Sequence, residues 1–440
     1  MSFINFKEDL IKIKTNINSE IDNEKLEYFF KYLEKKYNIE KKIIKKYFKR
    51  RVSEELSYIK PEQYSNISVK ILNKQILSSV IIYFGFKILI KLFSIKSNKK
   101  LKSKIIVDDI KSTNEIRRMT DLFSNFKKND LIFVVRKNFK NVDKNINFFI
   151  QEDFKNYSKE ILKGKFRIFD LTEFLFLIKY SFKSKLNLFI VYKNFINDFF
   201  YYSSLFSNIQ GKIIIQERIL GRTNIIKNYL FKKYHKGRNI YMQTHLLPYD
   251  TQALFFDCDI FFSLGKKSFS SIKNLSCEIN EVIPIGSHSL NYYYSNKNYL
   301  SEEPLFFKSL KKSYDIIFIG SNVTFNTRNN WEGYYETIRW LKNLGSQTNL
   351  NVFIMHHENW PEDKKEFKIT KNSNLEYFPK HLNSYYFALK ANVIITYCST
   401  MALELLPFKT VYFTDPFNNN NFLNDEFSYN NLILKTYKEF

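Results

Sequence analysis

Two hydroxyl residues, Ser399 and Thr400, follow an apolar run and precede a helical pattern. Residues 392–398 (NVIITYC) are typical of a buried strand and residues 401–406 (MALELL) of a helix, so the hydroxyls lie where a strand becomes a helix. Unpaired backbone N–H groups and the positive end of the helix dipole face outward at such a junction, where they bind phosphate. Glu404, one turn into the helix, is placed to accept hydrogen bonds from ribose hydroxyls. A plain Ser/Thr N-cap with a nearby Glu fits the same residues, and the sequence does not decide between the two.

Three other groups of polar residues stand at or just after the ends of predicted strands earlier in this part of the chain. They are the turn Gly320, Ser321 and Asn322, the nearby Arg328, and the pair His356 and His357. Carboxyl ends of parallel strands meet at the edge where open α/β sheets bind ligands, so we expect all of them at one phosphate site. Arg328 would neutralise phosphate charge, and a histidine would donate to a phosphate oxygen or to the leaving group. Adjacent residues of a strand point to opposite sides, so only one of the two histidines serves.

Two candidates for a general base end strands in the earlier half of the chain. His245 follows the run NIYMQT, and Glu217 follows GKIIIQ. His245 is the better candidate for removing a proton from an acceptor hydroxyl, because the ordinary pKa of histidine lies near neutrality, and Glu217 is the second. An ordinary polar residue at a strand end fits each position equally well.

The sequence gives little sign of a metal site. Asp257-Cys258-Asp259 resembles a carboxylate pair that holds Mn²⁺ or Mg²⁺, but it precedes an apolar strand and so stands at the wrong end of it. No Gly-x-x-x-x-Gly-Lys loop and no His-Glu-x-x-His pair occurs. The three cysteines stand far apart, which predicts neither a disulfide framework nor a zinc site and fits a reducing cytoplasm. We therefore expect neither a metal nor a cofactor.

Two series of short apolar runs, alternating with helical patterns, would position these residues. The first series reads KIIVDDI, DLIFVVRK, LNLFIVYKN, GKIIIQER, NIYMQTH, CDIFFSLG and EVIPIGS. The second begins at Tyr314 and reads YDIIFIGSN, NVFIMHHEN, NLEYF, NVIITYCST and KTVYFTDP. Such alternation predicts parallel sheets covered by helices, so the fold class is α/β with two Rossmann-like domains facing a cleft. We expect the domains at residues 104–290 and 313–440, with a polar, aperiodic linker over residues 288–312.

Residues 1–103 predict a basic, helical appendage. Residues 41–51 (KKIIKKYFKRR) fit either a helix on an anionic bilayer or an ordinary exposed helix. Residues 76–95 (ILSSVIIYFGFKILIKLFSI) form the most apolar stretch, but Lys87 and Lys91 disfavour a membrane-spanning helix, since a charge costs about 2.5–3.5 kcal/mol at a bilayer centre. An interfacial helix and a buried core helix both remain open for this stretch.

The net charge of +25 favours an anionic partner, although the abundance of Lys, Asn and Ile together with only 10 Gly also fits a solvated lysine surface produced by AT-rich codons. The N-terminus, MSFINFKEDLIKIK, lacks the apolar stretch and cleavage site of a secretory signal. We therefore expect a cytoplasmic protein, on the inner face of the membrane if it contacts lipid.

The ordered set of motifs resembles the two-lobed GT-B glycosyltransferases, in particular those of bacterial surface carbohydrate and capsule synthesis, over roughly residues 105–435. The matching places read Met242-Gln243-Thr244-His245, Ser263-Leu264-Gly265, Ile285-Gly286-Ser287, His356-His357-Glu358, Ser399-Thr400-Met401-Ala402-Leu403-Glu404 and Lys409-Thr410-Val411-Tyr412-Phe413. The chain departs from the family pattern where a Pro would follow the histidine and where a Gly would stand beside His245.

The resemblance implies a metal-independent transfer of a sugar from a nucleotide-sugar donor to a hydroxyl of a glycan or glycolipid acceptor, in capsule or lipopolysaccharide assembly. A polyol-phosphate (CDP-glycerol-type) transferase or a nucleotide-sugar epimerase fits the same fold. A reading from another class is a non-catalytic basic protein that binds nucleic acid or anionic membrane. We expect no nucleic-acid partner.

Overall fold

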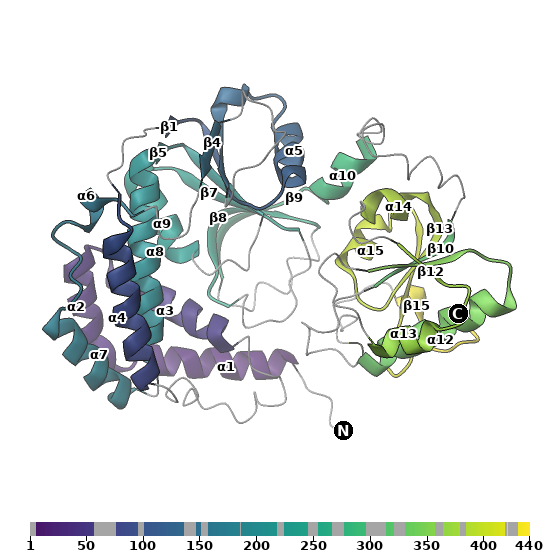
Figure 1. Ribbon diagram of the computed structural model, residues 1–440, viewed down its shortest axis with the longest axis horizontal. Coiled ribbons are helices and arrows are strands. Elements are labelled where there is room, and N and C mark those ends of the chain that lie inside the picture. Colours follow the sequence, from purple (N-terminus) through teal and green to yellow (C-terminus); the bar gives the residue numbers. More distant parts are fainter. Residues whose placement is uncertain are drawn as a thin grey trace. The chain divides into compact units, whose positions relative to one another are not determined.

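The computed structural model describes most of the chain and divides it into two compact units (Figure 1), the first from residue 4 to 285 and the second from residue 286 to 440. The described residues are 6–56, 76–95, 101–135, 147–150, 157–184, 186–217, 224–244, 254–265, 277–295, 314–320, 331–356, 364–378, 384–418, 420 and 430–440. The division differs from the expected one, because the N-terminal helices belong to the first unit and the boundary lies at residue 285 rather than 290.

A parallel seven-stranded sheet forms the centre of the first unit, in the order β4-β3-β2-β6-β7-β8-β9. Its strands are β2 (Ile105–Ile110), β3 (Leu131–Val135), β4 (Asn147–Ile150), β6 (Ile213–Gln216), β7 (Arg238–Met242), β8 (Asp257–Ser263) and β9 (Glu278–Pro284). β1 (Leu101–Lys102) pairs separately with β5 (Ile209–Gln210). From β2 the chain first adds strands on one side and then returns to the other side with β6, so the strand order reverses between β2 and β6.

Helices cover both faces of this sheet. They are α1 (Phe6–Ile21), α2 (Glu27–Tyr37), α3 (Lys41–Leu56), α4 (Ile76–Leu92), α5 (Thr113–Leu122), α6 (Lys159–Leu162), α7 (Leu171–Lys183), α8 (Leu188–Asn208) and α9 (Asn224–His235), with short 3₁₀ turns at Glu24–Leu26 and Lys128–Asp130. One hydrophobic core joins α1–α4 through α8 to one sheet face, where Ile106 and Ile214 lie. Ile116 and Met119 of α5 pack against the opposite face. The helices predicted in the N-terminal region are therefore confirmed, and they share a core with the first sheet.

One predicted strand is wrong. The run LNLFIVYKN begins the 21-residue helix α8, which lies between the sheet and α3, α4 and α7. Fourteen of the 21 residues of α8 are buried. A helix buried on nearly all sides has no polar face, so its sequence lacks the helical period and resembles a buried strand.

The second unit is also built on a parallel sheet, in the order β12-β11-β10-β13-β14-β15. Its elements are α10 (His288–Ser295), β10 (Tyr314–Ile319), α12 (Trp331–Gln347), β11 (Val352–Met355), α13 (Lys364–Thr370), β12 (Glu376–Tyr377), α14 (Ser384–Lys390), β13 (Ala391–Thr396), α15 (Thr400–Leu405), β14 (Thr410–Thr414), a 3₁₀ turn (Asn430–Leu432) and β15 (Ile433–Leu434). Figure 1 shows α12 and α13 on one side of the sheet and α14 and α15 on the other. The prediction of two α/β units with parallel sheets is confirmed.

The predicted linker is wrong at its start, because residues 288–295 form α10, which contacts α14 in the second unit. His288, Ser289, Leu290 and Tyr292 are buried there. Only Leu290 of these four has a purely apolar side chain, so the apolar pattern is too weak to indicate a helix. Residues 296–312 lie outside the described residues.

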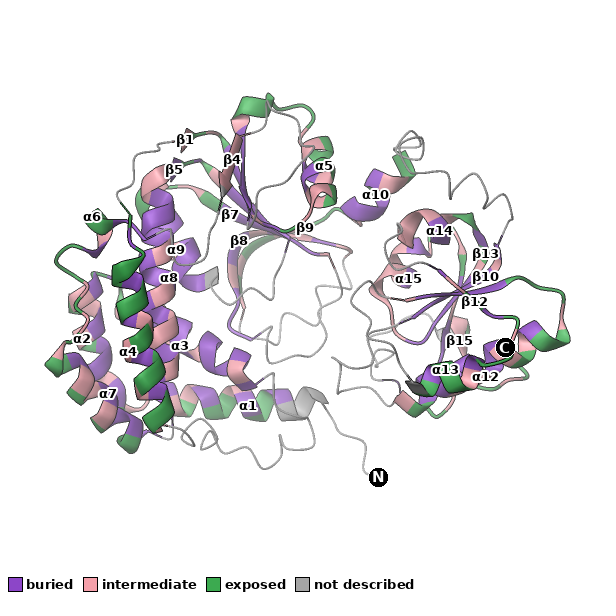
Figure 2. Ribbon diagram, viewed as in Figure 1, coloured by how far each residue is buried: buried purple, intermediate pink, exposed green. Residues whose placement is uncertain are grey.

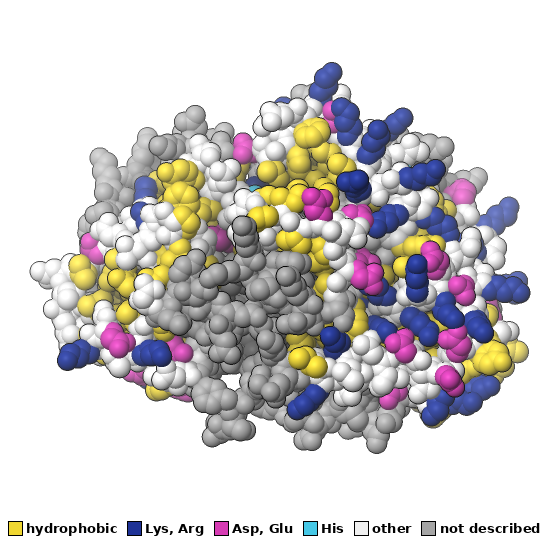
Figure 3. Space-filling model, turned by 180° about the vertical axis from the view of Figure 1, so that it is seen from behind, with side chains coloured by type: hydrophobic (Ala, Val, Ile, Leu, Met, Phe, Trp, Pro, Cys, Tyr) yellow, Lys and Arg dark blue, Asp and Glu magenta, His cyan; other side chains and the backbone are white. Residues whose placement is uncertain are grey.

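The surface of the first unit is basic without a single-sign patch on the face shown in Figure 3, where Lys and Arg side chains alternate with Asp and Glu. Several pairs form ion pairs, such as Lys49 with Asp22, whose Nζ and Oδ2 atoms are 2.6 Å apart. Within the described part of the chain, no helix combines the length and apolarity needed to cross a bilayer.

Candidate functional site

The strand order of the second sheet reverses between β10 and β13. The chain passes from β10 to β11 and β12 on one side, then returns to β13 and β14 on the other. Open α/β sheets bind ligands outside the carboxyl ends of the strands at such a switch point. Ile319 pairs with Thr396 in the register of β10 and β13, and the Thr396 hydroxyl donates to the Ile319 carbonyl at 2.8 Å. The residues that follow, Gly320 on one strand and residues 397–400 on the other, therefore lie at the switch point.

Gly320 occupies a place where no side chain fits without displacement. A Cβ added there would stand 3.2 Å from His356 Cδ2, 3.2 Å from the Tyr334 hydroxyl and 3.3 Å from the Met355 carbonyl oxygen. The Gly320 N–H donates to that same Met355 carbonyl at 2.8 Å, which fixes the backbone. The glycine thus brings backbone and the His356 ring close together at the carboxyl edge of β10 and β11.

His356 is held by a carboxylate. Its Nε2 lies 2.7 Å from Glu366 Oε1, and the two side chains are 6% and 1% exposed. Glu366 also accepts hydrogen bonds from the Tyr334 hydroxyl at 3.0 Å and the Tyr377 hydroxyl at 3.2 Å. A carboxylate fixed by two tyrosines fixes in turn the orientation of the imidazole, which is the arrangement that a positioned proton donor requires.

The strand-to-helix junction has the geometry that the sequence predicted. β13 ends at Thr396 and α15 begins at Thr400, with Ser399 as an extended N-cap residue at φ −145° and ψ 127°. The Ser399 side chain makes no capping hydrogen bond and is half-buried. The plain N-cap interpretation requires such a bond, so this geometry favours a hydroxyl that is available to a ligand. α15 has only six residues, so its dipole is short and the hydroxyls and sheet edge matter more.

Glu404 already accepts hydrogen bonds from hydroxyl groups. Its Oε2 accepts from the Ser287 hydroxyl and, at 2.8 Å, from the Tyr385 hydroxyl. Ser287 also caps α10, since its Oγ accepts from the Leu290 N–H at 3.0 Å. Tyr385 stacks on Tyr293 with ring centroids 5.4 Å apart. Protein hydroxyls therefore occupy the acceptor atom that we predicted for ribose.

Glu217 directly follows β6 at the switch point of the first sheet, next to β2. Arg118 of α5 holds both of its carboxylate oxygens, with Nη2 at 2.8 Å from Oε1 and 2.6 Å from Oε2. A carboxylate in a two-pronged pair with a guanidinium is a well-positioned anion, but its proton-accepting lone pairs are engaged. His245, the first candidate base, lies outside the described residues, as do Ser321, Asn322, Arg328 and His357.

The acidic pair at the start of β8 has structural partners. Asp257 Oδ1 accepts from Asn228 Nδ2 at 2.8 Å, and Asp259 Oδ2 accepts from the backbone and side-chain nitrogens of Asn239 at 2.9 Å each. Lys46 and Lys232 form ion pairs with Asp257 and Asp259. Among the described residues, no group of three or more His, Cys, Asp or Glu side chains is arranged to hold a metal ion.

Sequence reasoning found the edge residues but missed the groups that hold them. Gly320, His356, Ser399 and Thr400 each end or follow an apolar run, which is a readable signal. The structure brings Gly320 and His356 into contact and places Ser399 and Thr400 on the neighbouring strand end. Glu366 stands in the segment KKEFK, which reads as an exposed helix, and only the burial of its side chain at 1% exposure reveals its role.

A comparison with protein-family models and a search of curated proteins both found no match. Solved structures with a similar chain course include a UDP-GlcNAc 2-epimerase from Neisseria meningitidis bound to UDP-GlcNAc, with 13% identity, a TM-score of 0.44, and coverage of 71% of this chain and 82% of that chain. The UDP-GlcNAc 2-epimerase from Methanocaldococcus jannaschii has 10% identity, a TM-score of 0.45, and coverage of 77% and 90%. A trehalose-6-phosphate synthase has 10% identity, a TM-score of 0.44, and coverage of 77% and 89%.

Proposed function

We propose that the chain is a glycosyltransferase that moves a sugar from a nucleotide-sugar donor to a hydroxyl of a surface-polysaccharide acceptor. One observation carries the proposal: at the switch point of the second sheet, a glycine without room for a side chain, a carboxylate-held histidine and an uncommitted serine hydroxyl stand at three adjacent strand ends. Backbone N–H groups, a hydroxyl and an imidazole are the groups that bind a diphosphate.

Each residue of this edge has a role in the proposal. The Ser399 and Thr400 hydroxyls receive the diphosphate, and Gly320, which carries no side chain, lets it approach the strand end. His356, oriented by Glu366, donates to a phosphate oxygen and stabilises the charge that develops on the departing nucleotide. Glu404 exchanges its protein hydroxyl partners for those of the ribose.

The acceptor is a glycan or glycolipid, and the first unit supplies the base that removes the proton from its hydroxyl. His245 holds that role in the proposal, and Glu217, fixed by Arg118, orients acceptor hydroxyls. The reaction uses no cofactor and no metal, since the phosphate charge is met by backbone, hydroxyl and imidazole groups. The protein works in the cytoplasm, in capsule or lipopolysaccharide synthesis.

Thermal unfolding with UDP, GDP, CDP and CMP tests the proposal. A nucleotide at 100 times its dissociation constant adds about 2.7 kcal/mol to the free energy of unfolding. We expect one nucleotide to stabilise the chain and Ser399→Ala to abolish the effect. Ser346→Ala is the matched control, because the Ser346 hydroxyl only bonds to the Lys342 carbonyl of its own exposed helix face. If no nucleotide stabilises the wild-type protein, the proposal is wrong.

Product analysis with the stabilising nucleotide sugar separates the enzymes that share this fold. Transfer to an added glycan supports the proposal. Interconversion of the donor without an acceptor would identify an epimerase, and release of CMP from a CDP-polyol with transfer of the polyol phosphate would identify a polyol-phosphate transferase. Salt-sensitive binding to nucleic acid that persists in Ser399→Ala, without nucleotide binding, would identify a basic binding protein.

A further inference from the structure

Helix α4 turns three polar side chains inward and a stripe of apolar side chains outward. The side that faces the protein carries Ser79, Tyr83 and Lys87, at a spacing of four residues, beside the apolar Ile90, and all four are buried. The opposite side carries Leu77, Ile81 and Leu92, which are 78%, 68% and 70% exposed. Figure 2 shows this exposed side of α4 toward the viewer. A helix that packs onto a water-soluble protein places its apolar stripe inward, so α4 breaks the usual rule.

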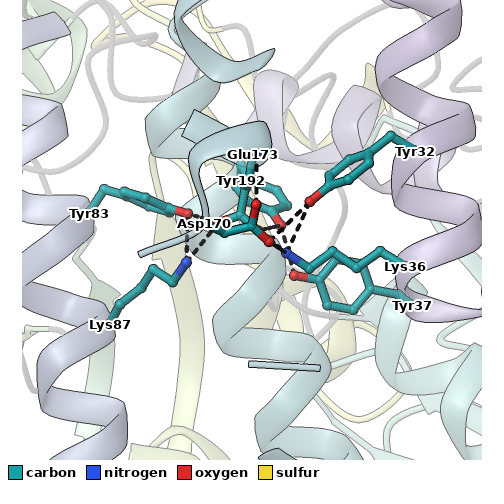
Figure 4. Close-up of polar contacts among 8 residues, drawn as sticks. All are labelled: Tyr32, Lys36, Tyr37, Tyr83, Lys87, Asp170, Glu173 and Tyr192. Atoms are coloured by element: carbon teal, nitrogen blue, oxygen red, sulfur yellow. Dashed lines mark hydrogen bonds and ion pairs between the residues drawn. The ribbon is translucent and has the colours of Figure 1, made fainter. Parts of the chain in front are cut away.

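The buried polar side of α4 is held by specific partners, which fixes the orientation of the helix. Lys87 Nζ lies 2.8 Å from Glu173 Oε1, and the side chains are 2% and 1% exposed. Tyr83 donates to the same carboxylate oxygen, and Tyr192 of α8 donates to the other at 2.7 Å. Lys36 of α2 also contacts Glu173, so the carboxylate joins four helices (Figure 4).

A rotation of α4 that buried its exposed apolar side would take two partners, Lys87 and Tyr83, away from Glu173. Lys36 and Tyr192 would still contact this buried carboxylate, but the loss of a buried ion-pair partner is destabilising. A further bond, from Asn187 Nδ2 to the Ser79 hydroxyl at 2.8 Å, anchors the first turn in the same orientation. The apolar side of α4 is therefore held outward by the core.

The apolar surface continues onto α7. Phe84 of α4 contacts Phe169, just before α7, and Phe174 within it, with ring centroids 5.9 Å and 5.6 Å apart. Leu171, Leu175 and Phe182, which share one side of α7, are 57%, 55% and 74% exposed. We call the exposed sides of these two helices the α4–α7 face.

All exposed charges on the two helices are positive. Lys91 on α4 and Lys179 and Lys183 on α7 are exposed, whereas the one acidic residue of the two helices, Glu173, is buried. An apolar surface with lysines and no carboxylates matches the interface of a bilayer that contains anionic lipids, since apolar side chains enter the acyl boundary and lysines reach the headgroups. A protein partner of mixed charge would not require this bias.

We propose that the α4–α7 face docks on the surface of a membrane that contains anionic lipids, with α4 lying flat in the headgroup layer. A helix of 17 residues is about 26 Å long, and it lies parallel to the bilayer rather than across it. The docking does not depend on the proposed transferase activity, and it would bring the chain to a lipid-linked acceptor if that activity holds.

Flotation of the full chain with vesicles tests the proposal without any nucleotide. The vesicles contain phosphatidylcholine alone or phosphatidylcholine with 30% phosphatidylglycerol. We expect binding to the anionic vesicles and at least a tenfold loss in the triple variant Leu77→Gln, Ile81→Gln, Leu92→Gln. Exposed apolar side chains contribute little to folding, so this variant unfolds at the wild-type temperature. The matched control, Ile11→Gln, Leu122→Gln, Leu350→Gln, changes three other exposed apolar residues and retains binding.

A second variant tests the charge. In the triple variant Lys91→Gln, Lys179→Gln, Lys183→Gln, we expect binding to anionic vesicles to fall by at least fivefold and binding to phosphatidylcholine vesicles to stay unchanged. The proposal is overturned if the wild-type chain floats with neither kind of vesicle. It is equally overturned if the variant Leu77→Gln, Ile81→Gln, Leu92→Gln, which we call the apolar-face variant, binds anionic vesicles as tightly as the matched control variant. It is also overturned if sedimentation without vesicles shows that the wild-type chain is a dimer and the apolar-face variant is a monomer, because a second copy of the chain would then cover the α4–α7 face.

Discussion

The carboxylate that holds His356 gives the sharpest test of the candidate site. Glu366→Ala removes the acceptor of two buried groups, His356 Nε2 and the Tyr334 hydroxyl. The half-buried Tyr377 hydroxyl also loses it, but keeps the Thr370 hydroxyl as a second acceptor. A buried donor without its acceptor costs about 1–3 kcal/mol, so the two buried groups together lower the free energy of unfolding by at least about 2 kcal/mol. The second unit has about 150 residues, for which 1 kcal/mol shifts the melting temperature by roughly 2–4 °C. We therefore expect its transition to fall by about 4–8 °C.

Scanning calorimetry measures this shift, and two further variants interpret it. Glu366→Gln keeps an acceptor oxygen and should recover a large part of the loss. Glu332→Ala removes a carboxylate that is 59% exposed and pairs with Lys365 on the surface, so its effect stays within about 0.5 kcal/mol. If Glu366→Ala melts at the temperature of Glu332→Ala, the carboxylate does not organise the site.

Nucleotide binding separates positioning from stability. At a temperature where Glu366→Gln remains folded, its affinity for the stabilising nucleotide should fall, because a neutral amide no longer holds the imidazole as a charged partner does. His356→Ala should lower the affinity by a similar factor, and the double variant should lose no more than either single variant. Additive losses would show that Glu366 does not act through His356.

Three other changes test separate parts of the fold. Gly320→Ala should cost about 1–3 kcal/mol by overpacking, whereas Gly345→Ala, whose Cβ would have neighbours at 3.7 and 3.9 Å inside a helix, should be neutral or stabilising by urea unfolding. Burial raises the pKa of Asp198 to about 7, above its value of about 3.9 in the unfolded chain, so this group favours folding below pH 4 and loses that contribution as pH rises through 7. Asp198→Asn should remove a fall of about 2–3 kcal/mol in the free energy of unfolding between pH 5 and 8, and an unchanged pH profile would contradict the reasoning. Lys87→Met should destabilise the first unit by about 1.5–3 kcal/mol, because Glu173 loses one of its two lysine partners and keeps Lys36, and a melting temperature equal to wild type would count against the role of the pair.

The strands of both sheets were largely predictable, because short apolar runs bounded by polar residues are the signature of buried parallel strands. The prediction failed at α8, where the apolar run belongs to a buried helix, and it missed the strands β4 and β15. Local pattern contains no information about how many sides of a segment are covered. Only the surrounding helices decide that α8 is the centre of a bundle.

The candidate site was likewise predictable from the sequence only in part. Ser399, Thr400 and Gly320 were visible because a strand end fixes where they lie relative to a sheet edge. The partners that make them chemically useful come from elsewhere in the chain, as with Arg118, whose guanidinium meets Glu217 from 99 positions away. A charged residue in a short amphipathic segment reads as solvated until the tertiary structure shows what covers it.

Helix α4 makes this dependence most explicit, because the sequence left open whether residues 76–95 form an interfacial or a buried helix. In the structure Ser79, Tyr83 and Lys87 lie on the buried side, and Leu77, Ile81 and Leu92 lie on the exposed side. Burial of apolar area alone would turn the leucines inward, since each contributes about 1.5–3 kcal/mol when fully buried. The observed orientation therefore requires either that the polar cluster around Glu173 outweighs that gain, or that the apolar stripe is buried elsewhere. A membrane surface meets the second condition without any change in the protein. Loss of vesicle binding in the apolar-face variant, at unchanged stability, would therefore show that the apolar stripe is buried in a membrane.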